Sequence, residues 1–195
     1  PLLTAEQAAG GSAVFLANPC NPSGGLLDVP ALRQAVRDRP GVIWIIDESF
    51  IDYADGTESL LRDAALLPNL VVLRSLTKFY GIAGVRCGFS VCAAPLAERL
   101  RQSLPAWNVN AFAAAAVQAV LEQPPSWADG ERALNRERRE DLFRRLSALP
   151  GAAVLPSGAN FLLFRLAGAP SGLAARLLKN HGIALRDCSN YPGLE

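Results

Sequence analysis

The segment from Leu70 to Gly88 restricts the folds that this chain can adopt. An apolar run, Leu70–Leu73, stands between the turn Pro68-Asn69 and a polar stretch, and its length and β-branched residues are typical of a buried parallel strand. Lys78 would then lie just beyond the carboxyl end of a strand, which is the edge at which open α/β sheets bind ligands. A solvated loop lysine is the alternative, and the residues around Lys78 must decide between the two.

Two further apolar runs, Ala13–Ala17 and Val42–Ile46, predict strands that also end in polar residues. A turn cluster follows the first run, and Asp28 is expected to cap the helix Val29–Arg39 after it. Asp47 directly follows the second run. Because an unpaired carboxylate is costly to bury, we expect Asp47 either to cap a neighbouring loop or to pair with a cation.

Composition narrows the function classes. The chain has 195 residues, of which 50% are hydrophobic and 19% charged, and its formal net charge is +1. These values indicate an ordinary globular protein and give no electrostatic reason to expect nucleic acid or an anionic membrane as a partner. No apolar run approaches the roughly 20 residues of a membrane helix, and we expect a cytoplasmic protein with free thiols at its four cysteines. His181 is the only histidine, so no metal site is predicted.

Three motifs together resemble the fold type I pyridoxal-phosphate (PLP) enzymes. Ser75-x-x-Lys78 is followed by Gly84-x-Arg86-x-Gly88, as in the cofactor-lysine segment of that class. Residues 18–24 resemble its Asn-Pro-x-Asn-Pro-Ser-Gly segment, and residues 47–50 its Asp-Glu-Ala-Tyr or Asp-Glu-Ala-Phe segment. The resemblance implies an α/β fold with a mostly parallel sheet in a large PLP-binding domain, followed by a small α+β domain.

The resemblance also implies a role for each motif residue. A lysine forms a Schiff base only when neutral, and an arginine fork suits a phosphate because it makes two parallel charge-assisted hydrogen bonds. An aspartate facing the pyridine nitrogen keeps the ring protonated as an electron sink. The implied roles are Lys78 as Schiff-base lysine and proton shuttle, Asp47 as ring-nitrogen partner, Asn21 as donor to the phenolic oxygen, Ser75 with Arg86 as phosphate clamp, and Thr77 as a residue that serves either the phosphate or the turn.

One residue and two further segments are similar to one branch of this class, the threonine-phosphate decarboxylases of cobalamin biosynthesis and the related histidinol-phosphate aminotransferases. Phe50 stands where many aminotransferases have a tyrosine, and the segments 105–110 and 187–193 are similar to loops of that branch. Trp107 is expected to face the substrate or to belong to the core. The resemblance implies a small phosphorylated amino acid as substrate and decarboxylation of O-phospho-threonine as the reaction, with aminotransfer as the first alternative. A PLP-sensing domain of a transcription regulator is the second.

The chain is expected to divide into part of the large domain, a connecting helix and part of the small domain, at residues 1–122, 123–150 and 151–195. In the last part, Ala153–Pro156, Asn160–Leu166 and Ile183–Arg186 are predicted as strands. Enzymes of this class also have a glycine-rich phosphate loop, a ring stacked on the cofactor and a carboxylate-binding arginine, none of which is found here. The sequence therefore resembles a fragment, and a homodimer is expected for the full-length protein.

Overall fold

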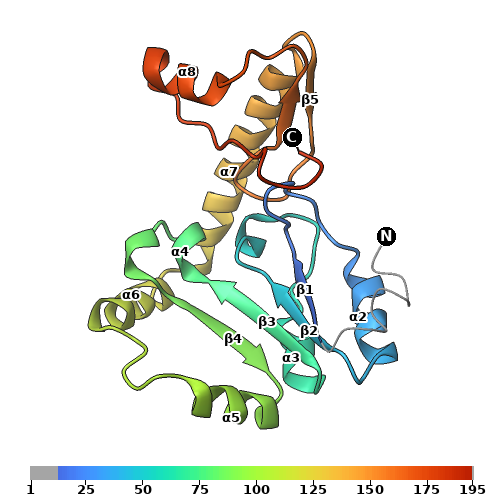
Figure 1. The fold of residues 1–195 in the computed structure, drawn as a ribbon. Helices are drawn as coiled ribbons and strands as arrows, with labels where there is room; N and C mark the ends of the chain where they lie inside the picture. Colours follow the sequence, from blue (N-terminus) through green and yellow to red (C-terminus); the bar gives the residue numbers. More distant parts are fainter. Residues whose placement is uncertain (1–12, 195) are drawn as a thin grey trace.

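The computed structural model describes residues 13–194, and its main feature is a four-stranded sheet (Figure 1). The strand order is β1-β2-β3-β4, in which the first three strands are parallel and β4 is antiparallel to β3. The mostly parallel α/β sheet was predicted. The strands are β1 Ala13–Ala17, β2 Ile43–Asp47, β3 Leu70–Ser75 and β4 Gly88–Cys92.

One face of the sheet packs against α2 (Val29–Asp38) and α3 (Leu61–Leu66). Side chains two residues apart on a strand share a face, so Trp44 and Ile46 of β2 both point into this core and are almost completely buried. Leu32 of α2 is fully buried against them. Burying a side chain of this size contributes about 1.5–3 kcal/mol. The large lobe is therefore held together on this face of the sheet.

The start of α2 agrees with the sequence pattern. Asp28 is its N-cap, because the Oδ1 atom of Asp28 accepts a hydrogen bond from the backbone N–H of Ala31 at 2.9 Å. This bond satisfies one of the N–H groups that lack a partner in the first helical turn.

The remaining helical elements of the large lobe connect or follow its strands. They are η1 Ile51–Tyr53, α4 Leu76–Phe79, η2 Ala83–Val85, α5 Ala94–Ser103 and α6 Ala111–Leu121.

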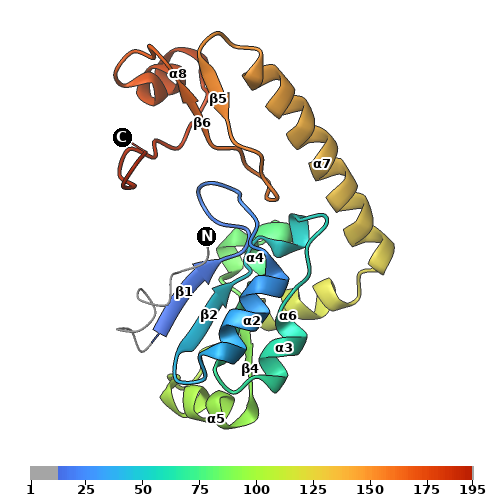
Figure 2. The same ribbon diagram turned by 90° about the vertical axis from the view of Figure 1, so that its right-hand side faces the viewer.

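A long helix, α7 (Pro125–Ser147), joins the large lobe to a small one (Figure 2). Beyond it lie the antiparallel strands β5 (Ala152–Val154) and β6 (Phe164–Leu166) and the helix α8 (Leu173–His181). The strand predicted for Ile183–Arg186 is wrong, because these residues pair with no strand of the described chain. An apolar run adopts strand geometry only where a neighbouring strand completes its hydrogen bonds.

None of the helices described in residues 13–194 has the length and apolar character needed to cross a membrane. The four cysteines are free, as expected from their spacing.

Candidate active site

The carboxyl ends of the three parallel strands lie side by side. In the register of the sheet, Ala17 is paired with Asp47, and Asp47 is paired with Leu73. The chain that leaves β1 therefore begins the Asn18–Gly25 loop beside Asp47, and β3 ends in Ser75 close to both. The residues that the sequence motifs single out lie at this edge of the sheet or in the segments next to it, and this edge is where α/β folds bind ligands.

Lys78 lies on the short helix α4, which begins directly after β3. Ser75 caps this helix: its Oγ atom accepts from the backbone N–H of Thr77 at 3.3 Å and lies 2.7 Å from Thr77 Oγ1. Thr77 is buried, whereas Lys78 is exposed. The Lys78 amine lies 5.5 Å from the centroid of the Phe50 ring and makes no ion pair within residues 13–194. The cap thus holds Lys78 at the surface, and its amine has no carboxylate partner among the described residues.

Asp47 is half-buried, and it caps a turn instead of pairing with a cation. Its Oδ1 atom accepts from the backbone N–H of Ser49 at 2.8 Å, and the part of the chain that the structure describes contains no cation in ion-pair contact with it. Of the two roles that the sequence left open for this carboxylate, loop capping is the one observed. The other carboxylate oxygen has no hydrogen bond to the described residues, so it can meet a protonated ligand.

Arg86 adopts a left-handed backbone conformation, with φ of 59° and ψ of 62°. Such a conformation is uncommon for a residue other than glycine, and strained residues of this kind cluster at functional sites. The exposed guanidinium donates one hydrogen bond to the carbonyl of Ala83 at 3.0 Å and has no carboxylate partner among the described residues. It is therefore free to bind an anionic group.

Gly88 is required by the pairing of β3 with β4. A Cβ atom at this position would lie 2.7 Å from the backbone carbonyl oxygen of Arg74. Glycine at this position allows β4 to pair with the end of β3.

The Asn18–Gly25 loop places Asn21 on the surface. Asn18, fully buried, holds the loop: its Oδ1 atom accepts from the backbone N–H of Leu27 at 3.0 Å, and its own N–H donates to the carbonyl of Asp47 at 2.9 Å. The far end of the loop touches the small lobe, because Gly158 donates its N–H to the carbonyl of Gly24 at 2.8 Å. The loop is thus fixed to β2 at one end and to the small lobe at the other.

A buried charged network behind Asp47 was missed by the sequence analysis. Glu48 is completely buried and accepts hydrogen bonds from Ser59 Oγ at 2.5 Å and from the backbone N–H of Leu60 at 2.8 Å. Arg74 lies 3.6 Å from Glu48 and also pairs with Asp52. Burial raises the pKa of Glu48, while the hydrogen bonds and Arg74 oppose this rise. An arginine within an otherwise apolar strand was the available signal.

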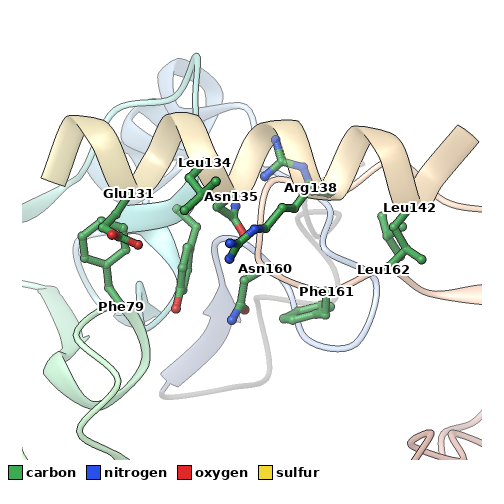
Figure 3. A pocket seen from close by; sticks show the side chains of 11 residues that line it. Phe79, Glu131, Leu134, Asn135, Arg138, Leu142, Asn160, Phe161 and Leu162 are labelled. Carbon is green, nitrogen blue, oxygen red and sulfur yellow. The ribbon is translucent and has the colours of Figure 1, made fainter. Parts of the chain in front are cut away.

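The ring of Phe50, on which the Lys78 amine lies, packs edge-on against Phe161 of the small lobe, with 5.1 Å between centroids. A cavity of about 340 Å³ lies between α7 and residues 160–162. Figure 3 shows that Arg138 extends from α7 toward Asn160, whereas Glu131 extends toward Phe79. Small-lobe side chains thus meet large-lobe ones close to Lys78. Trp107, in contrast, is 98% exposed and does not belong to the core of the described chain.

The sheet and its free lysine, aspartate and arginine define the fold type I class that the motifs resemble. Residues 2–194 match the sequence model of the family aminotransferase class I and II, so the chain belongs to this family. It is 39% identical to the threonine-phosphate decarboxylase of Salmonella typhimurium over 187 residues, which are 93% of this chain and 50% of that protein. The histidinol-phosphate aminotransferase of Rhodospirillum centenum is 35% identical over 91% of this chain and 50% of its own length.

Among solved structures, the L-threonine-O-3-phosphate decarboxylase of Porphyromonas gingivalis superposes with a TM-score of 0.86 at 29% identity. The match covers 94% of this chain and 57% of that one. The chain therefore has the aminotransferase fold and spans about half the length of the relatives that it matches.

Proposed function

We propose that the full-length protein is a PLP-dependent enzyme that decarboxylates L-threonine O-3-phosphate to (R)-1-amino-2-propanol O-2-phosphate. The observation that carries this proposal is the unpaired amine of Lys78, beside Phe50 at the strand-end edge that also bears Asp47 and Arg86. The relative with 39% identity is a threonine-phosphate decarboxylase, which supports this reaction.

The residues at the strand ends fit PLP. Lys78 offers a free amine for the cofactor aldehyde, Asp47 a free carboxylate oxygen for the ring nitrogen, and Asn21 an exposed amide for the phenolic oxygen. Arg86 offers its guanidinium and Ser75 its hydroxyl for the phosphate; Thr77 is a weaker candidate, because its hydroxyl is buried against Ser75. Bound PLP would supply an electron sink for the bond that breaks at Cα.

Within this site, each side chain has a definite task. The negative charge of Asp47 keeps a proton on a nitrogen opposite it, because a nearby opposite charge favours the charged form. The Lys78 amine, once released, holds or delivers a proton at Cα. Phe50 lacks a hydroxyl, so Asn21 alone among the motif residues would donate to the phenolic oxygen.

Aminotransfer to or from a phosphorylated substrate is the second candidate, favoured by the 35% identity to a histidinol-phosphate aminotransferase. Both reactions use the same lysine and aspartate. They differ in which bond to Cα would break, so the orientation in which the site holds the substrate would decide between them. Phe50 and the Trp107–Asn110 loop are the features that favour decarboxylation.

Incubation of the full-length protein with each substrate distinguishes the candidates. We expect carbon dioxide release from O-phospho-threonine without any keto acid acceptor, and no release by a Lys78→Ala variant. Lys179→Ala, on the exposed α8, is the matched control and should retain the activity. Acceptor-dependent conversion of histidinol phosphate without carbon dioxide release would establish the aminotransferase. Cofactor binding with no turnover of either substrate would establish a sensory domain.

We further propose that the full-length protein is a homodimer. Trp107, just before α6, and Phe112 and Leu121, both on α6, are each at least 78% exposed, and large exposed apolar side chains are typical of surfaces that bind a partner. Light scattering on the full-length protein should give twice the mass of one chain, and a monomeric mass would contradict the proposal.

A further inference from the structure

The hydroxyl of Tyr53 donates a hydrogen bond to the backbone carbonyl of Lys78, with 2.7 Å between the oxygens. Lys78 is the third residue of the four-residue helix α4, and the carbonyls of a last helical turn have no partner within the helix. The backbone N–H groups of Tyr80 and Gly81 also donate to this carbonyl, that of Gly81 at 3.2 Å. Within the described residues, Tyr53 is the donor that comes from a distant segment, 25 residues earlier in the sequence.

Tyr53 is itself held on two sides. Its ring packs edge-on against Phe79, with 5.0 Å between the centroids. Its neighbour Asp52 pairs with Arg74, and Arg74 precedes Ser75, the cap of α4. The turn η1 is therefore fastened to both ends of the Ser75–Phe79 segment, by Asp52 at the start and by Tyr53 at the end.

We propose that Tyr53 is a positioning residue that fixes Lys78 for its work on the cofactor, by capping α4 at the Lys78 carbonyl. The proposal rests on the proposed function, in which Lys78 carries PLP. Within residues 13–194, the Lys78 side chain itself contacts only the face of Phe50 in a charge-specific way. The direction of the amine consequently depends on the orientation of the backbone at Lys78, which the Tyr53 hydroxyl restrains.

The hydroxyl keeps its proton under ordinary conditions. Burial raises the pKa of Tyr53 above its usual value of 10.0, and the carboxylates of Asp52 and Glu131 raise it further. The phenol therefore remains a hydrogen-bond donor throughout the neutral range, and its bond to the carbonyl does not depend on pH there.

The test is a Tyr53→Phe substitution in the full-length protein loaded with PLP. The variant keeps the ring that packs on Phe79 and loses only the hydroxyl. Tyr80→Phe is the matched control, because Tyr80 belongs to the same aromatic cluster and stacks on Trp127 at 5.4 Å, while the structure shows no hydrogen bond from its hydroxyl to the described residues. Both variants are compared with the parent protein in cofactor release, in the induced circular dichroism of the bound cofactor and in thermal unfolding.

We expect Tyr53→Phe to release PLP about fivefold faster, the effect of one lost hydrogen bond, and to lower the induced circular dichroism per bound cofactor. Tyr80→Phe should change neither quantity. The dichroism reports how rigidly the cofactor is oriented, so a role in stability alone would not move it. Unchanged release and dichroism in Tyr53→Phe, or an equal change in Tyr80→Phe, would overturn the inference.

Peptide mapping after borohydride reduction separates this inference from the proposed function. A pyridoxyl adduct on Lys78 of the parent protein, together with unaltered behaviour of Tyr53→Phe, refutes only the positioning role. An adduct on another lysine, or on none, refutes the assignment of Lys78 and with it the inference.

Discussion

Arg86 combines a left-handed backbone with a free guanidinium, so stability and binding should respond differently to its replacement. For Arg86→Gly, relief of the left-handed strain and the greater freedom of the unfolded chain nearly cancel, so the unfolding free energy of the cofactor-free full-length protein should change by less than about 1 kcal/mol. PLP affinity should fall by about tenfold or more, because a charge-assisted contact with phosphate is lost. Calorimetry measures both quantities.

Arg86→Ala is the control for this prediction. It loses the same guanidinium but keeps a Cβ atom in the left-handed region, as the parent does. It should therefore bind PLP as weakly as Arg86→Gly, and its unfolding free energy should lie within about 1 kcal/mol of the parent's. A glycine variant with unchanged PLP affinity would show that Arg86 does not bind the phosphate.

Glu48 should make the stability of the protein depend on pH. Its pKa is raised in the folded state by burial, so the folded state binds a proton more tightly than the unfolded one, whose glutamate has its ordinary value of 4.5. The stabilisation from this group is therefore complete below pH 4.5 and declines as pH rises through the higher folded pKa. A Glu48→Gln substitution can keep the bonds to Ser59 and Leu60, and it removes the titrating group.

Denaturant unfolding of full-length parent and Glu48→Gln proteins, measured at several pH values, checks this. The difference in unfolding free energy, parent minus variant, should decrease as pH rises above 4.5. A parent-minus-Glu48→Gln difference that increases with pH would contradict the prediction.

The positions of the site residues could be predicted from the sequence, whereas their supports could not. Lys78 and Asp47 follow apolar runs whose ends are visible in the sequence, and parallel pairing brings such ends together. The Glu48–Arg74 contact and the Tyr53 hydrogen bond join residues 25 or more positions apart, and their geometry depends on how η1 folds back over β3. No local sequence pattern predicts how η1 folds back over β3.

Among the connecting elements, the Asn18–Gly25 loop has the most sharply defined steric requirement. Gly24 has φ of +72°, and a Cβ atom there would lie 2.1 Å from Ser157 Oγ. Gly24→Ala should destabilise the full-length protein by about 2–4 kcal/mol, from the unfavourable φ together with the clash. It should also weaken PLP binding, because the loop carries Asn21.

Gly56→Ala is a matched control, since Gly56 has the same φ of +72° with no atom within 4 Å of an added Cβ. It should cost about 1–2 kcal/mol, the backbone contribution alone. Equal losses in the two variants, measured by thermal unfolding, would show that the contact of the loop with the small lobe adds nothing to stability.

At the same scale, elements with strong caps or long apolar runs were predictable and short ones were not. The N-cap Asp28 marks the start of α2, and α2 ends one residue before the predicted boundary. Helix α3 was missed because it has six residues and its N-cap residue, Leu60, has no capping side chain.

For the molecule as a whole, residues 1–195 expressed alone should be inactive and marginally stable. The chain spans about half the length of its relatives, and Phe15 on the uncovered face of the edge strand β1 is 60% exposed. Open strand edges and apolar faces promote association. We expect a broad unfolding transition, compared with a sharp one for the full-length protein. A sharp transition together with turnover in the shorter chain would refute this.

Because α7 connects the two lobes, a small tilt of this helix would move the small lobe by a larger distance. Its 23 residues, at 1.5 Å per residue, extend about 35 Å, so a tilt of about 5° at Pro125 would move Ser147 by about 3 Å. The small lobe includes Gly158, whose N–H donates a hydrogen bond to the carbonyl of Gly24, and Phe161, whose ring packs against Phe50. A small tilt of α7 would thus shift both the Gly158–Gly24 hydrogen bond and the Phe161–Phe50 contact. Movement of the small lobe would therefore change the surroundings of Lys78.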